Sequence, residues 1–344
     1  MTKRKIGVLG AGTWGMALAR MLTVSGNEVQ VWSAIEAEVD NLSTTRVHPN
    51  LPGMKIPAEL QFTKSIEDVC TGKDVLLFAV PSVFVRGTTA KARPYIPDGQ
   101  ILVDVAKGME PDTLYTMTEV IADELSRDGG PKNCRLVALS GPTHAEEVAL
   151  DLPTTIVSAC PDDEAARFVQ DVFSNTCMRV YTNPDIKGVE LSGALKNVIA
   201  LGVGISTGLG YGDNARAALI TRGIAEIARL GVAMGCNIHT FAGLAGIGDL
   251  IVTATSMHSR NNRAGILIGK GESPEQAVKE VGMVVEGINA LPAAMELAAK
   301  YNVEMPIVQT VNAIVKEGMS ASDALRTLMD RNRKNEMPQG YENL

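Results

Sequence analysis

Six short aliphatic segments alternate with amphipathic segments over the first half of this 344-residue chain. Most of the aliphatic segments are nearly continuous in Val, Ile and Leu, which is typical of strands buried on both faces of a parallel sheet. Strands that alternate with helices predict an open, doubly wound, mainly parallel sheet with right-handed crossovers. We predict strands at residues 5–9, 28–32, 74–79, 101–105, 135–139 and 154–159, and helices at residues 14–24, 83–92, 113–125 and 162–173.

The pattern changes near Asp185. From Gly188 onward the sequence has no convincing strand, only stretches rich in Ala, Gly, Leu and Ile followed by capped amphipathic segments. A chain of this length also exceeds one ordinary domain. We therefore expect an α/β domain over residues 1–187 and an all-α domain over residues 188–344.

Composition and charge exclude several classes of protein. The formal net charge of −7 argues against a general basic face, so nucleic acid and anionic membranes are not expected partners. No apolar stretch of about 18 residues lacks a polar interruption, and the first residues lead directly into a strand. We expect neither a membrane span nor a signal peptide. The cysteines are scattered and odd in number, which favours reduced thiols in the cytoplasm over disulfides or a metal site: Cys70, Cys134, Cys160, Cys177 and Cys236.

A glycine motif lies directly between the first predicted strand and the first predicted helix. The segment 10–15, Gly-Ala-Gly-Thr-Trp-Gly, has the G-x-G-x-x-G spacing. Gly10 would allow a tight turn, Gly12 would let the backbone approach a pyrophosphate, and Gly15 would let helix and strand pack closely. The exposed N–H groups at the start of the helix would hold phosphates. Because a second strand follows in register, the motif predicts a Rossmann-like, dinucleotide-binding domain rather than a purely structural turn.

The end of the second predicted strand leaves the choice between NAD and NADP open. An Asp or Glu at this point would bind the ribose hydroxyls of NAD, and an Arg would favour NADP. The segment Trp32-Ser33-Ala34-Ile35 contains neither, and Glu36 and Glu38 come slightly late.

Polar residues follow two of the predicted strands, at the edge where open α/β sheets bind ligands. Lys107 comes just after the strand at 101–105, and the segment 140–145, which includes Gly141, Thr143 and His144, comes just after the strand at 135–139. A surface lysine and a plain strand-to-helix turn explain these positions equally well.

Two further segments carry candidate catalytic and binding groups in the second half. Lys196 lies in a helical stretch that is apolar almost throughout, and burial lowers the pKa of an ammonium toward the range of a general acid or base. Asp249 follows a run of small residues and is expected to be partly buried beside a cation, for which Lys196 is a candidate. Arg260 and Asn261 could form an anion clamp, although a solvated loop explains them slightly better.

Taken together, these segments resemble the NAD(P)-dependent sn-glycerol-3-phosphate dehydrogenases of the bacterial type, from Ile6 to about Ala324. An ordered set of motifs is far more specific than a single glycine turn. The motifs are GAGTWG at 10–15, NLPG at 50–53, AKGME at 106–110, SGPTHAEEV at 140–148, ELSGALKNV at 190–198, GLAGIGDL at 243–250, HSRN at 258–261 and VVEG at 284–287.

The resemblance implies reversible reduction of dihydroxyacetone phosphate to sn-glycerol 3-phosphate by NAD(P)H, supplying phospholipid synthesis, in a cytoplasmic homodimer. It implies that Lys196 is the acid/base group, that Lys107 and Asp249 complete the active site, and that Arg260 and Asn261 hold the substrate phosphate. The implied cofactor contacts are Gly10, Gly12, Thr13, Trp14, Gly15, Ala34, Lys107, Ala145, Arg260, Val284 and Glu286. The implied substrate contacts are Lys107, Gly141, Thr143, Lys196, Asn197, Asp249, Thr253, Ser259, Arg260 and Asn261.

The sequence departs from the family pattern at two positions. Ala34 stands where Arg or His is common, which puts a contact to the adenosine ribose or its phosphate in doubt. His144 stands where an aromatic residue such as Phe is common, and we interpret it as a conservative change near the nicotinamide and not as a catalytic histidine.

Two alternative functions remain open at this point. The first is another dehydrogenase with the same layout, such as a 3-hydroxyacyl-CoA or 6-phosphogluconate-like enzyme. The hydroxyacyl type would need a His–Glu pair, and neither His239 nor His258 lies in such a context. The second is a nucleotide-sensing protein that has lost its activity. The presence of the candidate charged residues argues against it: Lys107, Lys196, Asp249 and Arg260.

Overall fold

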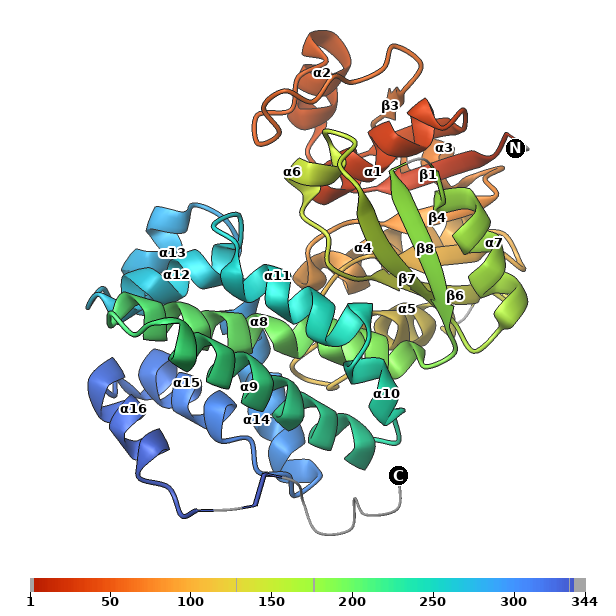
Figure 1. Cartoon of the computed structure of the whole chain (residues 1–344). Helices are drawn as coiled ribbons and strands as arrows, with labels where there is room; N and C mark the ends of the chain where they lie inside the picture. Colours follow the sequence, from red (N-terminus) through yellow and green to blue (C-terminus); the bar gives the residue numbers. More distant parts are fainter. Residues whose placement is uncertain (1–2, 128, 176, 334, 337–344) are drawn as a thin grey trace.

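The computed structural model describes all residues except 1–2, 128, 176, 334 and 337–344, and shows a sheet-containing half beside a helical half (Figure 1). One eight-stranded sheet has the order β3-β2-β1-β4-β5-β6-β7-β8. Its strands are β1 Lys5–Leu9, β2 Glu28–Trp32, β3 Gln61–Thr63, β4 Val75–Phe78, β5 Ile101–Asp104, β6 Arg135–Ser140, β7 Thr154–Ala159 and β8 Met178–Asn183. All six predicted strands are confirmed, within one residue at each end.

Two strands were missed by the sequence analysis, and both lie at an edge of the sheet. β3 has only three residues and no fully buried side chain, so it has no aliphatic run. β8 alternates buried Met178 and Val180 with exposed neighbours, which is the pattern of a strand with one solvated face.

Helices cover both faces of the sheet, as the prediction of a doubly wound fold requires. One core cluster joins the sheet to α1 and α7, and another joins the opposite face to α3, α4 and α5. The helices of this half are α1 Thr13–Val24, α2 Glu36–Thr45, α3 Ile66–Cys70, α4 Val85–Ala92, α5 Met117–Leu125, α6 Ala145–Val148 and α7 Asp163–Phe173.

The pairing of β6 with β7 is antiparallel, whereas every other strand pair of the described sheet is parallel. The connection between these two strands contains only the four-residue helix α6. A parallel crossover needs an element long enough to return to the starting edge, so this connection reverses the chain instead. Because β6 runs parallel to β5, β4 and β1, the residues after β6 lie at the same edge as the glycine turn after β1.

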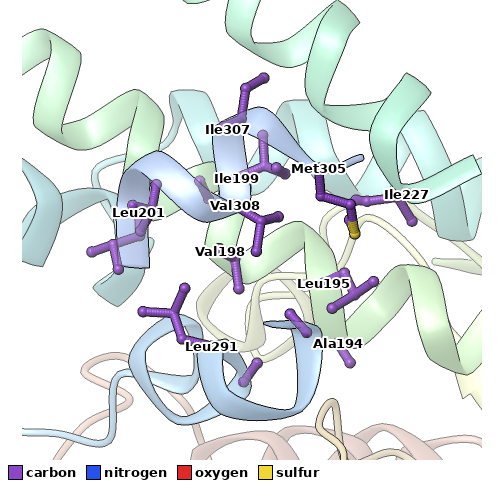
Figure 2. Packing of buried hydrophobic residues seen from close by; sticks show 14 of the residues in the cluster. Ala194, Leu195, Val198, Ile199, Leu201, Ile227, Leu291, Met305, Ile307 and Val308 are labelled. Atoms are coloured by element: carbon purple, nitrogen blue, oxygen red, sulfur yellow. The ribbon is translucent and has the colours of Figure 1, made fainter. Parts of the chain in front are cut away.

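From Ile186 onward the described residues form helices and no strand. They are α8 Ile186–Gly208, α9 Asp213–Ala233, α10 Ile238–Phe241, the π-helical turn η3 Leu244–Gly248, α11 Asp249–Thr255, α12 Arg260–Gly269, α13 Pro274–Val281, α14 Glu286–Lys300, α15 Pro306–Glu317 and α16 Ala321–Met329. Helix α8 runs through the middle of this half. Its apolar side chains meet those of α9, α14 and α15, as Figure 2 shows for Leu195, Val198, Ile227, Leu291 and Val308.

The glycines of α8 serve mainly close helix packing. A Cβ at Gly204 would lie 2.3 Å from the carbonyl oxygen of Asn262, and a Cβ at Gly208 would lie 2.3 Å from that of Ile266, both on α12. Backbones can approach this closely only where side chains are absent. The cost of glycine in a helix is therefore offset by the packing of α12 on α8.

Two helical segments are long and apolar enough to cross a membrane, α8 and the segment Ile238–Thr255. The apolar window of α8 is entirely buried inside the protein, and 44% of the other window is buried. Helix α8 owes its apolar character to its position in the core.

Candidate active site

The glycine turn after β1 has the geometry that the motif predicts. Gly10 adopts a φ of 121°, and a Cβ there would lie 2.6 Å from the carbonyl oxygen of Ala79. A Cβ at Gly15 would lie 2.3 Å from the carbonyl oxygen of Gly10, whereas a Cβ at Gly12 would meet nothing within 4 Å. Gly10 and Gly15 thus allow the tight turn and close packing, and Gly12 faces open space.

The start of α1 is suited to an anion. Gly12 is the N-cap and has no side chain, and the first turn, which contains Thr13 and Trp14, has no acidic residue. The free N–H groups and the positive end of the helix dipole therefore face the open space beside Gly12. These residues fit the pyrophosphate of a dinucleotide.

Lys196, Asp249 and Lys107 form one cluster, although they come from α8, α11 and the loop after β5. The Nζ of Lys196 donates to Oδ1 of Asp249 at 2.6 Å, and the Nζ of Lys107 donates to Oδ2 at 2.7 Å. Lys196 also donates to the Oγ1 of Thr253, and Lys107 donates to the carbonyl oxygen of Gly141 at 3.1 Å. The cluster joins the helical half to the carboxyl edge of the sheet.

The small residues before Asp249 explain its position. Gly246 leaves helical geometry, with φ −93° and ψ −106°, and a Cβ there would lie 2.1 Å from the carbonyl oxygen of Phe241. The chain can therefore turn tightly in η3 and begin α11 against α8. Asp249 is 1% exposed as a result, and its two oxygens each accept from a lysine.

The electrostatics of the cluster favour a lysine that titrates near neutrality. Burial lowers the pKa of Lys196 to about 7, the attraction of Asp249 opposes this shift, and the positive charge of Lys107 adds to it. Two amines share one carboxylate, so the cluster is neutral or positive depending on the proton of Lys196. Such a site can stabilise and protonate an oxygen on which negative charge develops.

Arg260 and Asn261 begin α12 but differ in their surroundings. Arg260 is exposed, whereas Asn261 is 8% exposed. The Nδ2 of Asn261 donates to Oδ1 of Asn197 at 2.9 Å, and its Oδ1 accepts from the N–H of Gly287 at 2.8 Å. The Oγ of Ser259 accepts from the N–H of Asn262 at 3.2 Å and caps α12. The Asn261 amide thus links α12 to α8 and α14, and of these two residues only Arg260 carries a positive charge.

Two of the expected cofactor contacts, Val284 and Glu286, lie where α14 approaches the sheet. The Oγ of Ser82, in the short helix η1 Ser82–Phe84 after β4, donates to Oε2 of Glu286 at 3.0 Å. Burial raises the pKa of Glu286, and the Ser82 hydrogen bond and the Arg260 charge oppose the shift. Val284 is 37% exposed just before this helix. The sequence analysis missed Ser82, which carries no motif.

His144 lies near the cluster and faces the loop before α12. Its ring centroid is 5.6 Å from that of His258, and its Nε2 is 3.4 Å from the carbonyl oxygen of Val252. Burial lowers the pKa of His144, and the positive charge of Lys196 adds to the effect. The Oγ1 of Thr143 donates to the carbonyl oxygen of Gly141 at 3.1 Å, and Ala145 begins α6.

Glu190 is a second buried charged residue of α8 that the sequence analysis did not single out. Its carboxylate accepts from the N–H of Thr118 and the Oγ1 of Thr116, both at 2.8 Å, and from the Oγ1 of Thr118. These contacts join α8 to the start of α5. A glutamate in an otherwise apolar helix was the available signal. Among the described residues, no group of three or more His, Cys, Asp or Glu side chains is placed to hold a metal ion.

Comparisons with known proteins agree with this geometry. Family models described as NAD-dependent glycerol-3-phosphate dehydrogenase N-terminus and C-terminus match residues 5–166 and 185–326. A Lactobacillus delbrueckii subsp. bulgaricus protein named glycerol-3-phosphate dehydrogenase (NAD(P)+) 2 is 68% identical over 97% of this chain and 99% of its own. A solved glycerol-3-phosphate dehydrogenase of Coxiella burnetii is 34% identical, with TM-score 0.90 over 96% of this chain and 99% of that chain. This chain therefore belongs to the NAD-dependent glycerol-3-phosphate dehydrogenase family.

Proposed function

We propose that this protein catalyses the reversible reduction of dihydroxyacetone phosphate to sn-glycerol 3-phosphate with NAD(P)H, and so supplies glycerol 3-phosphate for phospholipid synthesis. The observation that carries the proposal is the buried Lys196–Asp249–Lys107 cluster. It lies at the sheet edge that also holds the glycine turn, because β1 and β5 are both parallel to β4, which lies between them. Family membership and the names of the relatives support the same reaction.

Lys196 is the general acid of the reduction and the general base of the reverse reaction. Its ammonium donates a hydrogen bond to the carbonyl oxygen of the substrate and transfers its proton as charge develops there. Bound NAD(P)H would supply the hydride. Asp249 orients Lys196 and opposes the lowering of its pKa by burial, and Thr253 holds the same Nζ. Lys107 adds a second positive charge and ties the cluster to Gly141.

Arg260 binds the phosphate of the substrate, remote from the reacting carbon. A guanidinium binds phosphate through parallel N–H groups, and this binding energy positions the carbonyl. Asn197 and Asn261 hold the start of α12 against α8 and so orient Arg260. His144 contributes a neutral side chain to the wall of the site.

The first test is the substrate itself. We expect the protein to oxidise NADH or NADPH with dihydroxyacetone phosphate, but not with a 3-ketoacyl thioester or without a second substrate. Initial rates of absorbance loss at the nicotinamide band measure this. Binding of reduced nucleotide without turnover of dihydroxyacetone phosphate would favour the nucleotide-sensing protein instead.

Replacement of Arg260 by alanine is expected to raise the KM for dihydroxyacetone phosphate by roughly 10–100-fold, the value of a hydrogen bond to a charged group. The affinity for NADH should change little. The matched control is Lys270→Ala, which removes an exposed cation at the other end of α12. Steady-state kinetics measure both variants, and an unchanged KM for Arg260→Ala would remove this residue from the phosphate site.

The organisation of the chain is part of the proposal. We assign residues 1–187 to the dinucleotide-binding domain and residues 188–344 to the catalytic helical domain, since β8 ends at Asn183 and α8 begins at Ile186. The protein acts in the cytoplasm as a homodimer and does not insert stably into membranes. The complete burial of the apolar window of α8 supports the last point.

A further inference from the structure

The end of β2 lies beside the glycine turn, where the adenosine ribose of a dinucleotide is read in this type of fold. β1 and β2 are parallel, with Leu9 opposite Trp32, and the N–H of Gly10 donates to the carbonyl oxygen of Trp32 at 2.8 Å. The side chains that follow Trp32 would therefore contact the adenosine ribose of a bound dinucleotide. Ala34, at this point, is exposed and has only a methyl group.

A carboxylate from α2 is held at this position. The Oγ of Ser33 donates to Oε2 of Glu38 at 2.6 Å, and the same Oγ accepts from the N–H of Ile35 at 3.1 Å. Ser33 itself is 6% exposed, so it is an immobile anchor for the exposed Glu38. Helix α2 thus places an acidic group at the end of β2, where the strand itself has none.

A longer-range electrostatic interaction relates Glu38 to the glycine turn through His48. His48 is buried, and its Nε2 is 3.3 Å from the carbonyl oxygen of Ala11, inside the turn. Burial lowers the pKa of His48, while the Ala11 hydrogen bond and the negative charge of Glu38 oppose the shift. Glu38 therefore lies within electrostatic range of a side chain that touches the turn. The lowered pKa of His48 favours its neutral form beside this carboxylate.

Two cations of the neighbouring segments, Lys64 and Arg46, have contacts of their own. Lys64 pairs with Asp40 at 2.8 Å and with Glu36 at 3.4 Å. Arg46 donates to the carbonyl oxygens of Pro57 and Leu60 and stacks on a phenylalanine ring. The positive end of α2 is also compensated, since Glu36 and Glu38 occupy its first turn.

We propose that Glu38 reads the adenosine ribose and makes this enzyme selective for NADH over NADPH. The inference rests on the proposed function and adds the choice of cofactor to it. The carboxylate of Glu38 accepts hydrogen bonds from the 2′- and 3′-hydroxyls of NADH. The 2′-phosphate of NADPH would instead bring about two negative charges beside the carboxylate of Glu38.

The test is equilibrium binding of NADH and NADPH, followed by nucleotide fluorescence, which does not depend on turnover. We expect wild type to bind NADH at least about tenfold more tightly than NADPH, as a charge-assisted hydrogen bond predicts. Glu38→Gln should lower this ratio by about tenfold, by weakening NADH binding and strengthening NADPH binding. Ser33→Ala should lower it less, because the carboxylate remains but loses its anchor.

Glu36→Gln is the matched control, because Glu36 is a first-turn glutamate of the same helix but pairs with Lys64. It should leave the ratio unchanged. Equal ratios in Glu38→Gln and Glu36→Gln, or a wild type that binds NADPH as tightly as NADH, would overturn the inference. Selective NADH binding without reduction of dihydroxyacetone phosphate would overturn the proposed reaction but not the role of Glu38.

Discussion

Replacement of Lys196 by alanine is expected to lower kcat for dihydroxyacetone phosphate reduction by roughly 10²–10⁴-fold, the range of general acid–base catalysis. The loss should fall on the chemical step, because Lys196 is the buried amine whose pKa of about 7 suits proton transfer near neutrality. The Kd for NADH should stay nearly unchanged, since the glycine turn and α1 are not in contact with this side chain. Steady-state kinetics and NADH fluorescence titration measure the two effects.

The variant should still fold, because Asp249 keeps its ion pair with Lys107 at 2.7 Å. Lys187→Ala is the matched control: it removes another lysine of α8, one that pairs with Glu119 near the surface and not with Asp249. We expect this control to have wild-type kcat. A loss of NADH binding together with kcat in Lys196→Ala would show that the lysine is structural.

Replacement of Asp249 by asparagine is expected to lower kcat by about 100-fold or more, because the amines of buried Lys196 and partly exposed Lys107 then lose the carboxylate that they share. It should also move the pH profile. Reduction needs protonated Lys196, so kcat/KM in wild type falls as the pH rises through about 7, and the reverse oxidation gains over the same range. Asp249 raises the pKa of Lys196, so its removal shifts the fall in reduction to lower pH.

Initial rates between about pH 5 and pH 9, in both directions, measure this shift. Glu226→Gln is the matched control, because it removes a buried carboxylate that does not contact Lys196. Glu226 accepts from the N–H groups of Ile307 and Val308 at the start of α15, and burial raises its pKa to about 7. This control should lower the melting temperature and leave the pH profile in place. A profile that does not move in Asp249→Asn would separate Asp249 from the proton of Lys196.

The parts of the fold that were predicted correctly depend on local patterns. Strands β1, β2 and β7 have the predicted bounds, because each contains several buried Val, Ile or Leu residues within a short segment. The glycine turn was predicted because three glycines within six residues have separate mechanical roles. Edge strands β3 and β8 were missed, since partial solvation removes that pattern.

The site was predicted less completely than the fold. The pairing of Lys196 with Asp249 was expected, because a buried carboxylate needs a cation. The pairing of Lys107 with Asp249 was not expected, because the two residues are 142 positions apart in the chain. In space their side chains are only 2.7 Å apart. Asn261 is expected to help bind an anion, and this stays a prediction; in the structure its amide also joins α12 to α8 and α14.

The sequence by itself determined where the inner strands of the sheet and the glycine turn occur, and that Lys196 would be buried, because each of these depends on the pattern within one element. Only the tertiary structure decided which charges share a carboxylate, that the pKa of Lys196 is about 7, and that Glu38 returns to Ser33 at the end of β2. These properties depend on distances between elements and on their burial, which follow from how the elements pack.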